Sequence, residues 1–254
     1  MKNSNNHNII KSVSRATSVL IALSHKLNRV SDIATEVNLS NSTVHRLLQA
    51  LKESGLVILD TLDHKYYFGH LMAEFASEPV TTHQHLIRIS RKKMEYLRDI
   101  SKESVALHIR FGLERIRLEE IIGPQNITYI GQREVIDPVW PGAHGKVLLS
   151  QISKDKLEEV YKKLELAKLT PKTITNKTVL QKEVEKTRKQ GYAVSYGEST
   201  EGVAGLSVPV RNYIDAISLT IAGPEKRFSP IMMNFLGELK KKAKEIEQEL
   251  LEIK

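Results

Sequence analysis

Residues 40–55 read Ser-Asn-Ser-Thr-Val-His-Arg-Leu-Leu-Gln-Ala-Leu-Lys-Glu-Ser-Gly, and this stretch decides the fold of the N-terminal part of the chain. Ser40 is a residue type that accepts a hydrogen bond from the first free N–H groups of a helix, and Gly55 readily adopts the left-handed conformation that ends one. The apolar residues between them, at spacings of three, one and three, are Val44, Leu47, Leu48 and Leu51. This spacing predicts a helix with one buried face.

The opposite face of this predicted helix is polar. Its residues, at the same spacing, are Ser42, His45, Arg46 and Gln49, and the window from Val37 to Lys52 contains no acidic residue. Arg46 can form two hydrogen bonds to guanine and Gln49 two to adenine, and His45 can contact a base or a phosphate. Most polar helix faces are simply solvated, so the neighbouring elements must decide between that interpretation and DNA binding.

Two shorter helical patterns precede this helix and a hairpin follows it. Residues 12–27 carry apolar residues at helical spacing, and Ser31 is expected to be the N-cap of a second helix that runs to Val37. Leu56–Leu59 and Tyr66–Phe68 predict two strands around a polar turn. Three helices and a hairpin in this order are typical of a winged helix-turn-helix, whose third helix enters the major groove of DNA.

The residues expected to contact DNA follow from this arrangement. Hydroxyl and backbone N–H groups at the start of the third helix suit phosphate, whereas Lys52 and the hairpin residue Lys65 would add affinity that does not depend on sequence. The candidate DNA-binding residues are Arg15, Ser40, Asn41, Ser42, Thr43, His45, Arg46, Gln49, Lys52 and Lys65.

The rest of the chain predicts a linker helix followed by an α+β domain. The linker helix spans 79–101; strands are predicted near 105–110, 116–122 and 127–131, helices at 142–150, 155–164 and 177–190, and further strands near 192–195, 206–210 and 216–222. A final helix with apolar residues from Leu236 to Ile253 is expected to pack on its own sheet. The expected domains are therefore 1–78, 79–101 and 102–254, and the last is expected to fold alone.

The composition excludes several classes of site. The chain has 254 residues and no cysteine, which rules out disulfides, cysteine-ligated zinc, iron–sulfur clusters and cysteine nucleophiles. Its 38 basic and 30 acidic residues give a net charge of +8, which favours polyanionic partners. No segment is apolar enough for a signal peptide or a membrane span, so a cytoplasmic protein without membrane contact is expected.

Ordered motifs in both halves of the chain resemble the IclR-type transcriptional regulators. The N-terminal motifs are Ser14-Arg15-Ala16 with Val19-Leu20, the run from Ser42 to Leu51, and Gly55-Leu56-Val57. The C-terminal motifs are the run from Pro141 to Leu149, Thr170 with Thr173-Ile174, Gly191-Tyr192-Ala193, Glu198 with Gly202-Val203, and Ser207-Val208-Pro209-Val210.

Two departures from the family pattern concern the hairpin and the pocket. Tyr67-Phe68-Gly69 stands where the family usually has Arg-Leu-Gly, so the basic contact of the wing falls to Lys65. Gly205 and Ser207 stand where relatives often carry Cys and Ala. The pocket wall should therefore differ in shape and polarity from that of the relatives.

The resemblance implies a regulator, expected to be a repressor, whose second domain is GAF-like and binds a small organic or aromatic acid. It also implies a homodimer or dimer of dimers on an inverted-repeat operator, with the 79–101 helix as the expected dimer seam. The start of the 142–150 helix would donate N–H groups to the effector carboxylate. The expected effector-binding residues are Tyr129, Trp140, Gly142, Ala143, His144, Gly145, Ser195, Glu198, Val203, Gly205, Leu206 and Ser207.

Enzyme motifs are incomplete in this chain. Gly145-Lys146 lacks the hydroxyl residue of a P-loop, because Val147 follows, and Gly197-Glu198-Ser199 lacks the closing glycine of a nucleophile elbow. Glu119 and Glu120 should point to opposite faces of a strand, and His83 and His85 lack a nearby third metal ligand. We therefore expect no catalytic residues, cofactor or metal. The alternative is a GAF-like enzyme or sensor whose N-terminal domain contacts a protein or an RNA.

Overall fold

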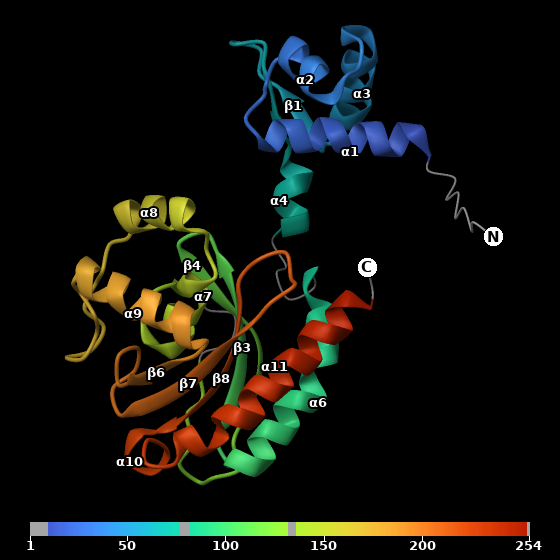
Figure 1. The fold of residues 1–254 in the computed structure, drawn as a ribbon. Helices are drawn as coiled ribbons and strands as arrows, with labels where there is room; N and C mark the ends of the chain where they lie inside the picture. The colour runs from blue at the N-terminus through green and yellow to red at the C-terminus, as the bar shows by residue number, and fades with distance from the viewer. Residues whose placement is uncertain (1–9, 77–81, 132–135, 253–254) are drawn as a thin grey trace. The chain divides into compact units, whose positions relative to one another are not determined.

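A computed structural model describes residues 10–76, 82–131 and 136–252 and divides the chain into two compact units, Met1–Glu78 and Pro79–Lys254 (Figure 1). The start of the predicted linker helix, residues 79–81, and Ile253 of the predicted final helix lie outside the described residues. Among the helices that the structure describes, none has the length and apolar character needed to cross a membrane.

The N-terminal unit is a winged helix-turn-helix, as predicted. Its elements are α1 (Lys11–Ser24), α2 (Val30–Val37), α3 (Asn41–Glu53), β1 (Val57–Leu59), β2 (Tyr66–Phe68) and α4 (His70–Ala76). The two strands pair antiparallel, and Val19, Ile33, Val44 and Leu48 from the three helices are fully buried in one core. The helical spacing of the apolar residues therefore identified the buried faces correctly.

Both ends of α3 were predicted correctly, whereas the start of α2 was not. Ser40 Oγ accepts a hydrogen bond from the Thr43 backbone N–H at 3.3 Å, and Gly55 has φ +79°, as expected for the two ends of α3. The prediction that Ser31 is an N-cap was wrong, because α2 begins at Val30, whose side chain packs against the core. Helix α4 was not predicted.

The second unit contains a six-stranded antiparallel sheet in the order β5-β4-β3-β8-β7-β6. In chain order its elements are α6 (Gln84–Ser101), β3 (Ser104–Phe111), β4 (Glu114–Ile121), β5 (Ile136–Pro138), α7 (Gly142–Ser150), α8 (Lys154–Lys163), α9 (Lys177–Gln190), β6 (Ala193–Tyr196), β7 (Val203–Val210), β8 (Ile217–Pro224), α10 (Glu225–Phe228), a 3₁₀ turn (Met232–Phe235) and α11 (Leu236–Leu251). The predicted strand at 127–131 is not formed. The Tyr129 carbonyl instead accepts a hydrogen bond from the Ser104 hydroxyl at 2.6 Å.

One face of this sheet is apolar and is covered by α6 and α11, which pack against each other (Figure 1). Met94 and Leu97 of α6 and Leu239 and Ile246 of α11 are fully buried on it. The prediction that the final helix packs on its own sheet is therefore confirmed. Leu86, Met94 and Leu97 of α6 are buried inside the same unit, whereas Tyr96 and Ile100 of this helix are exposed, and a dimer seam on 79–101 stays a prediction.

The other face of the sheet carries small and polar residues and is covered by α7. Three cross-strand rows lie on it: Ser195, Gly205, Ala222 and Ser104; Ser207, Thr220, Ala106 and Glu120; Pro209, Ser218, His108 and Arg117. A register shift between Leu107 and His108 places Arg117, rather than Leu118, beside His108. This face holds the candidate site of the second unit.

Candidate functional site

The polar face of α3 points to solvent. His45 and Arg46 are exposed and Gln49 is half-buried, whereas Val44 and Leu48 on the opposite face are fully buried. Within the described residues, the side chains of His45, Arg46 and Gln49 form no hydrogen bond or ion pair with the protein. These side chains are therefore free to bond to the edges of bases.

The start of α3 carries a cluster of hydroxyl groups. Ser40 Oγ lies 3.1 Å from Ser42 Oγ and 2.8 Å from Thr43 Oγ1, so the three predicted phosphate contacts are bonded to one another. Asn41 and Ser42 are exposed beside the unpaired N–H groups of the first turn. This end of α3 can accept a phosphate, and Arg15 on α1 is exposed as well.

Lys65, the predicted basic contact of the wing, forms an ion pair. Lys65 Nζ lies 3.1 Å from Asp63 Oδ2, and the Tyr67 hydroxyl donates to the same carboxylate at 2.7 Å. The hydrogen bond from Tyr67 is the main cause that lowers the pKa of Asp63, with a further contribution from Lys65. Asp63 therefore stays ionised at neutral pH and offsets the charge that Lys65 would offer to a phosphate.

A small cavity lies between α7 and the polar face of the sheet. It is lined by Ser104, Ala106, His108, Arg117, Glu120, Tyr129, His144, Ser195, Ser199, Thr200, Val203, Gly205, Thr220 and Ala222, and holds about 30 Å³. An adjacent cavity of about 280 Å³ shares Arg117, Tyr129, Ser199 and Thr200 with it. The inner cavity admits a group the size of a carboxylate, and a larger body would extend into the outer one.

Two imidazole rings form one wall of the inner cavity. His108 of β3 and His144 of α7 are stacked, with ring centroids 4.7 Å apart and planes inclined by 23°. His108 is only 3% exposed, and burial is the main cause that holds the pKa of both rings well below 6.5. The charges of Arg115 and Arg117 lower both pKa values further, so both imidazoles are neutral at pH 7.

Two ion pairs lie beside the imidazoles. Arg115 donates to Asp137 at 2.9 Å and to the Pro138 carbonyl at 2.6 Å, and burial lowers its pKa to about 10. Arg117 lies 3.5 Å from Glu120. Arg115 therefore remains charged at neutral pH, and each guanidinium group is paired with a carboxylate.

A carboxylate of the protein itself is bonded to α7. Glu198 accepts a hydrogen bond from Lys146 Nζ at 2.6 Å. Burial raises the pKa of Glu198, and the Lys146 charge opposes that rise. The hydroxyls of Thr170 and Thr173 donate to the backbone carbonyls of Gly197 and Glu198 (2.6 and 2.8 Å). These bonds hold the loop that places Ser199 and Thr200 over the cavity.

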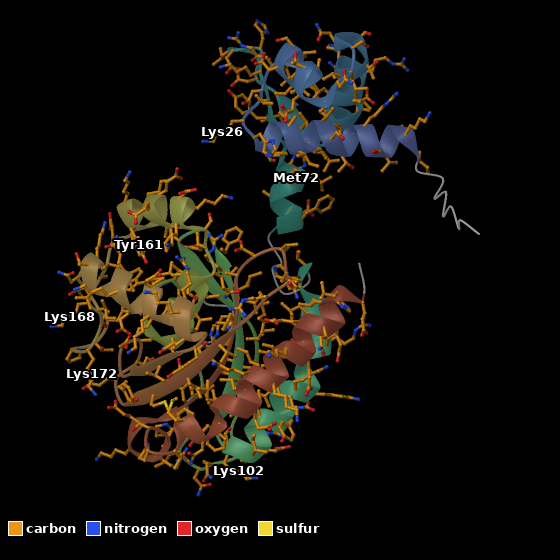
Figure 2. All side chains as sticks on the ribbon, in the orientation of Figure 1. Lys26, Met72, Lys102, Tyr161, Lys168 and Lys172 are labelled. Carbon is orange, nitrogen blue, oxygen red and sulfur yellow. The ribbon has the colours of Figure 1, made fainter. Side chains whose placement is uncertain are left out.

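The segment from Thr170 to Thr173 is also tied to α10. Lys172, which is labelled in Figure 2, donates to Glu225 at 2.7 Å, and Glu225 begins the short helix α10. The cover of the cavity is therefore a network of hydrogen bonds between three segments that are distant in sequence.

Five of the twelve predicted effector-binding residues line the cavity, namely Tyr129, His144, Ser195, Val203 and Gly205. The other seven, Trp140, Gly142, Ala143, Gly145, Glu198, Leu206 and Ser207, do not. Leu206 faces the apolar core on the other side of the sheet, and the Ser207 hydroxyl is bonded to Thr220 at 2.8 Å. Gly145 is needed for close packing, because a Cβ there would lie 2.4 Å from the Val139 carbonyl oxygen.

Sequence reasoning missed most of the polar wall, including His108, Arg117, Glu120, Ser199 and Thr200. A signal for part of it was present, because Ser104, Ala106 and His108 alternate with the apolar residues of β3 and so had to share the other face. The expectation that Glu119 and Glu120 point to opposite faces is confirmed. Glu119 bonds to Arg91 of α6 at 2.7 Å, whereas Glu120 lines the cavity.

Both units of the chain are similar to domains of known proteins. The bacterial IclR C-terminal domain matches residues 79–248, and the IclR helix-turn-helix domain matches residues 12–60. The HTH-type transcriptional regulator KipR of Bacillus subtilis is 29% identical over 92% of this chain and 94% of its own length.

Two solved structures share the fold over nearly the whole chain. Thermotoga maritima IclR is 28% identical with a TM-score of 0.63, covering 94% of this chain and 98% of that one. An IclR homologue from Microbacterium hydrocarbonoxydans, complexed with 4-hydroxybenzoate, is 22% identical with a TM-score of 0.60 and the same coverage. The helix-turn-helix, the sheet domain and these matches together show that the chain is a transcriptional regulator of the IclR family.

Proposed function

We propose that the chain represses transcription by inserting α3 of two copies into successive major grooves of an inverted-repeat operator. The observation that carries this proposal is the exposed polar face of α3, on which His45, Arg46 and Gln49 form no bond within the described part of the protein. A regulator of this kind acts where the DNA is, so we place it in the cytoplasm.

The second copy is expected because one helix offers few base contacts. With most of the apolar residues of α6 buried inside its own unit, we place the seam on α1. Ile10, the N-cap of α1, and Val13 and Ile21 on this helix are 67%, 62% and 52% exposed. A homodimer formed through this face, or a dimer of two such dimers, would cover it.

The effector is expected to be a small carboxylic acid that binds in the cavity between α7 and the sheet. The homologue from Microbacterium hydrocarbonoxydans supports this class, because its structure contains the aromatic acid 4-hydroxybenzoate. The two arginines and two imidazoles near the cavity supply donors that suit a carboxylate.

A footprint on the promoter beside the gene of this protein tests the function. The wild-type chain should protect an inverted repeat, and Arg46→Ala should lower the affinity for that site by about 1–3 kcal/mol, because it removes a base contact without disturbing the core. Arg29→Ala, which changes an exposed arginine before α2, serves as the control. Unchanged operator affinity in Arg46→Ala would show that α3 does not read the sequence.

A further inference from the structure

The stacked imidazoles of His108 and His144 are the least satisfied part of the inner cavity. Nδ1 of His108 and Nε2 of His144 are both buried and form no hydrogen bond. Because buried polar atoms almost always have a partner, two such atoms on the wall of one cavity indicate that a ligand supplies it. Both rings line the cavity, and they reach it from different elements, β3 and α7.

The described charged groups beside the two rings are held in ion pairs. Strand β4 contributes Arg115, Arg117 and Glu120, and Asp137 of β5 pairs with Arg115. From the other elements, β8 places the uncharged Ser218 beside His108, and Lys146 of α7 is bonded to Glu198. Among the described residues, two ion pairs thus lie beside two neutral imidazoles.

A bound carboxylate would add one negative charge to this enclosed space. Near the start of α7 that charge would face the carboxylate of Glu198, which is bonded to Lys146 at 2.6 Å. A proton taken from solvent onto one imidazole would offset the added charge and would turn an unbonded ring nitrogen into a donor to the carboxylate. Among the described residues beside the rings, Glu120 and Asp137 are already held in ion pairs.

We propose that the His108–His144 pair is the carboxylate-binding element of this site and takes up one proton when a small carboxylic acid binds. This inference rests on the proposed function, in which the cavity is the effector site. Since the free rings are neutral at pH 7, binding should strengthen as the pH falls, by about tenfold per pH unit while the acid itself stays ionised.

Calorimetry of the full-length chain tests the proposal. The probes are 4-hydroxybenzoate, pyruvate and gluconate, which share a carboxylate on an aromatic, a short and a hydroxylated body. Titrations at about pH 7.5 in phosphate and in Tris, whose ionisation heats differ, count the protons exchanged. We expect uptake of about one proton per bound acid, a Kd about tenfold weaker at one pH unit higher, and no binding of the corresponding carboxamides.

Three variants assign the proton to the pair. His108→Gln and His144→Gln should each bind the acid more weakly and with less proton uptake. His83→Gln removes another partly buried imidazole of the same unit, one that is bonded to the Tyr213 hydroxyl, and should bind and take up the proton like the wild type. Should one of the two cavity variants fail to fold, the other still tests whether the imidazole pair takes up the proton.

Two failures can be told apart. An acid that binds to the wild type with no proton uptake, or a carboxamide that binds as tightly as its acid, overturns the role of the imidazole pair and leaves the proposed function standing. If none of the acids binds, the proposed acid effector falls together with this inference.

Discussion

At the residue scale, the chemistry of the site depends on two imidazoles that the fold keeps neutral. His108 and His144 are neutral because burial removes the water that would stabilise their charge, and because two arginines lie close to them. A neutral imidazole can donate from one ring nitrogen and accept at the other, so the pair can bond to a carboxylate or to a hydroxyl group. When a fall in pH protonates one ring, both of its nitrogens become donors and the ring can no longer accept a hydrogen bond.

The lowered pKa values predict how stability depends on pH. Both rings bind a proton more readily in the unfolded chain than in the folded one, so their contribution is fully present above the unfolded pKa of about 6.5 and is lost as the pH falls through their lower folded values. Urea unfolding between about pH 8 and pH 5.5 should show a declining free energy of unfolding. His108→Gln should flatten this decline.

The control for this experiment is Ser218→Ala. Ser218 lies beside His108 in the register of β3 and β8 but does not titrate. This variant should keep the wild-type slope even if its stability changes. An equal slope in His108→Gln and the wild type would show that the imidazole is not the group responsible.

At the scale of elements, the start of α7 and the loop after β6 are joined by a buried ion pair. Replacing Glu198 by Gln would leave the Lys146 ammonium group, whose side chain is 3% exposed, with Glu183 at 3.5 Å as its remaining carboxylate. Loss of one partner of a buried pair costs about 3–5 kcal/mol, and we expect the lower end because Glu183 remains. Urea unfolding measures the loss.

A matched variant separates this effect from a general loss of charge. Glu183→Gln removes a carboxylate whose side chain is 35% exposed, and it should cost less than about 1 kcal/mol. The double change Lys146→Met with Glu198→Gln should recover much of the lost stability, because no buried charge is left unpaired. A similar cost for the two single glutamate variants would contradict the role assigned to Glu198.

The wing is a second element in which an ion pair matters. Asp63 pairs with Lys65 and so weakens the attraction that Lys65 would exert on DNA phosphates. Asp63→Asn should strengthen binding to all DNA sequences alike and steepen the salt dependence, because it frees Lys65 from its ion pair. Lys65→Gln should do the opposite. Filter binding to operator and to random duplex at several salt concentrations measures both, and an effect confined to the operator would mean that the wing reads bases.

At the scale of the whole molecule, the linker helix belongs to the core of the second unit. Leu86, Met94 and Leu97 of α6 are fully buried against the sheet and α11. A fragment of residues 79–254 should therefore fold cooperatively, whereas residues 102–254 alone should not, because the apolar face of the sheet would be exposed. Thermal unfolding followed by circular dichroism distinguishes them, and cooperative unfolding of the shorter fragment would refute this division.

The sequence by itself determined the elements whose signals are local. The spacing from Val44 to Leu51 identified the buried face of α3, Ser40 and Gly55 identified its ends, and the pattern of residues 105–110 identified strand β3. These features could be predicted because helix and strand periodicity depends on neighbours a few residues apart. The family was recognisable for the same reason, since its motifs are short runs in a fixed order.

The tertiary structure alone decided which residues share the cavity. His108, Arg117, His144 and Thr200 come from distant segments, and a register shift in β4 determines that Arg117 is the neighbour of His108. The partner of Lys146 was equally invisible, because only the folded chain shows that Glu198 accepts a hydrogen bond from it at 2.6 Å. Strand register and contacts across the sheet depend on packing between remote segments, and no local pattern encodes them.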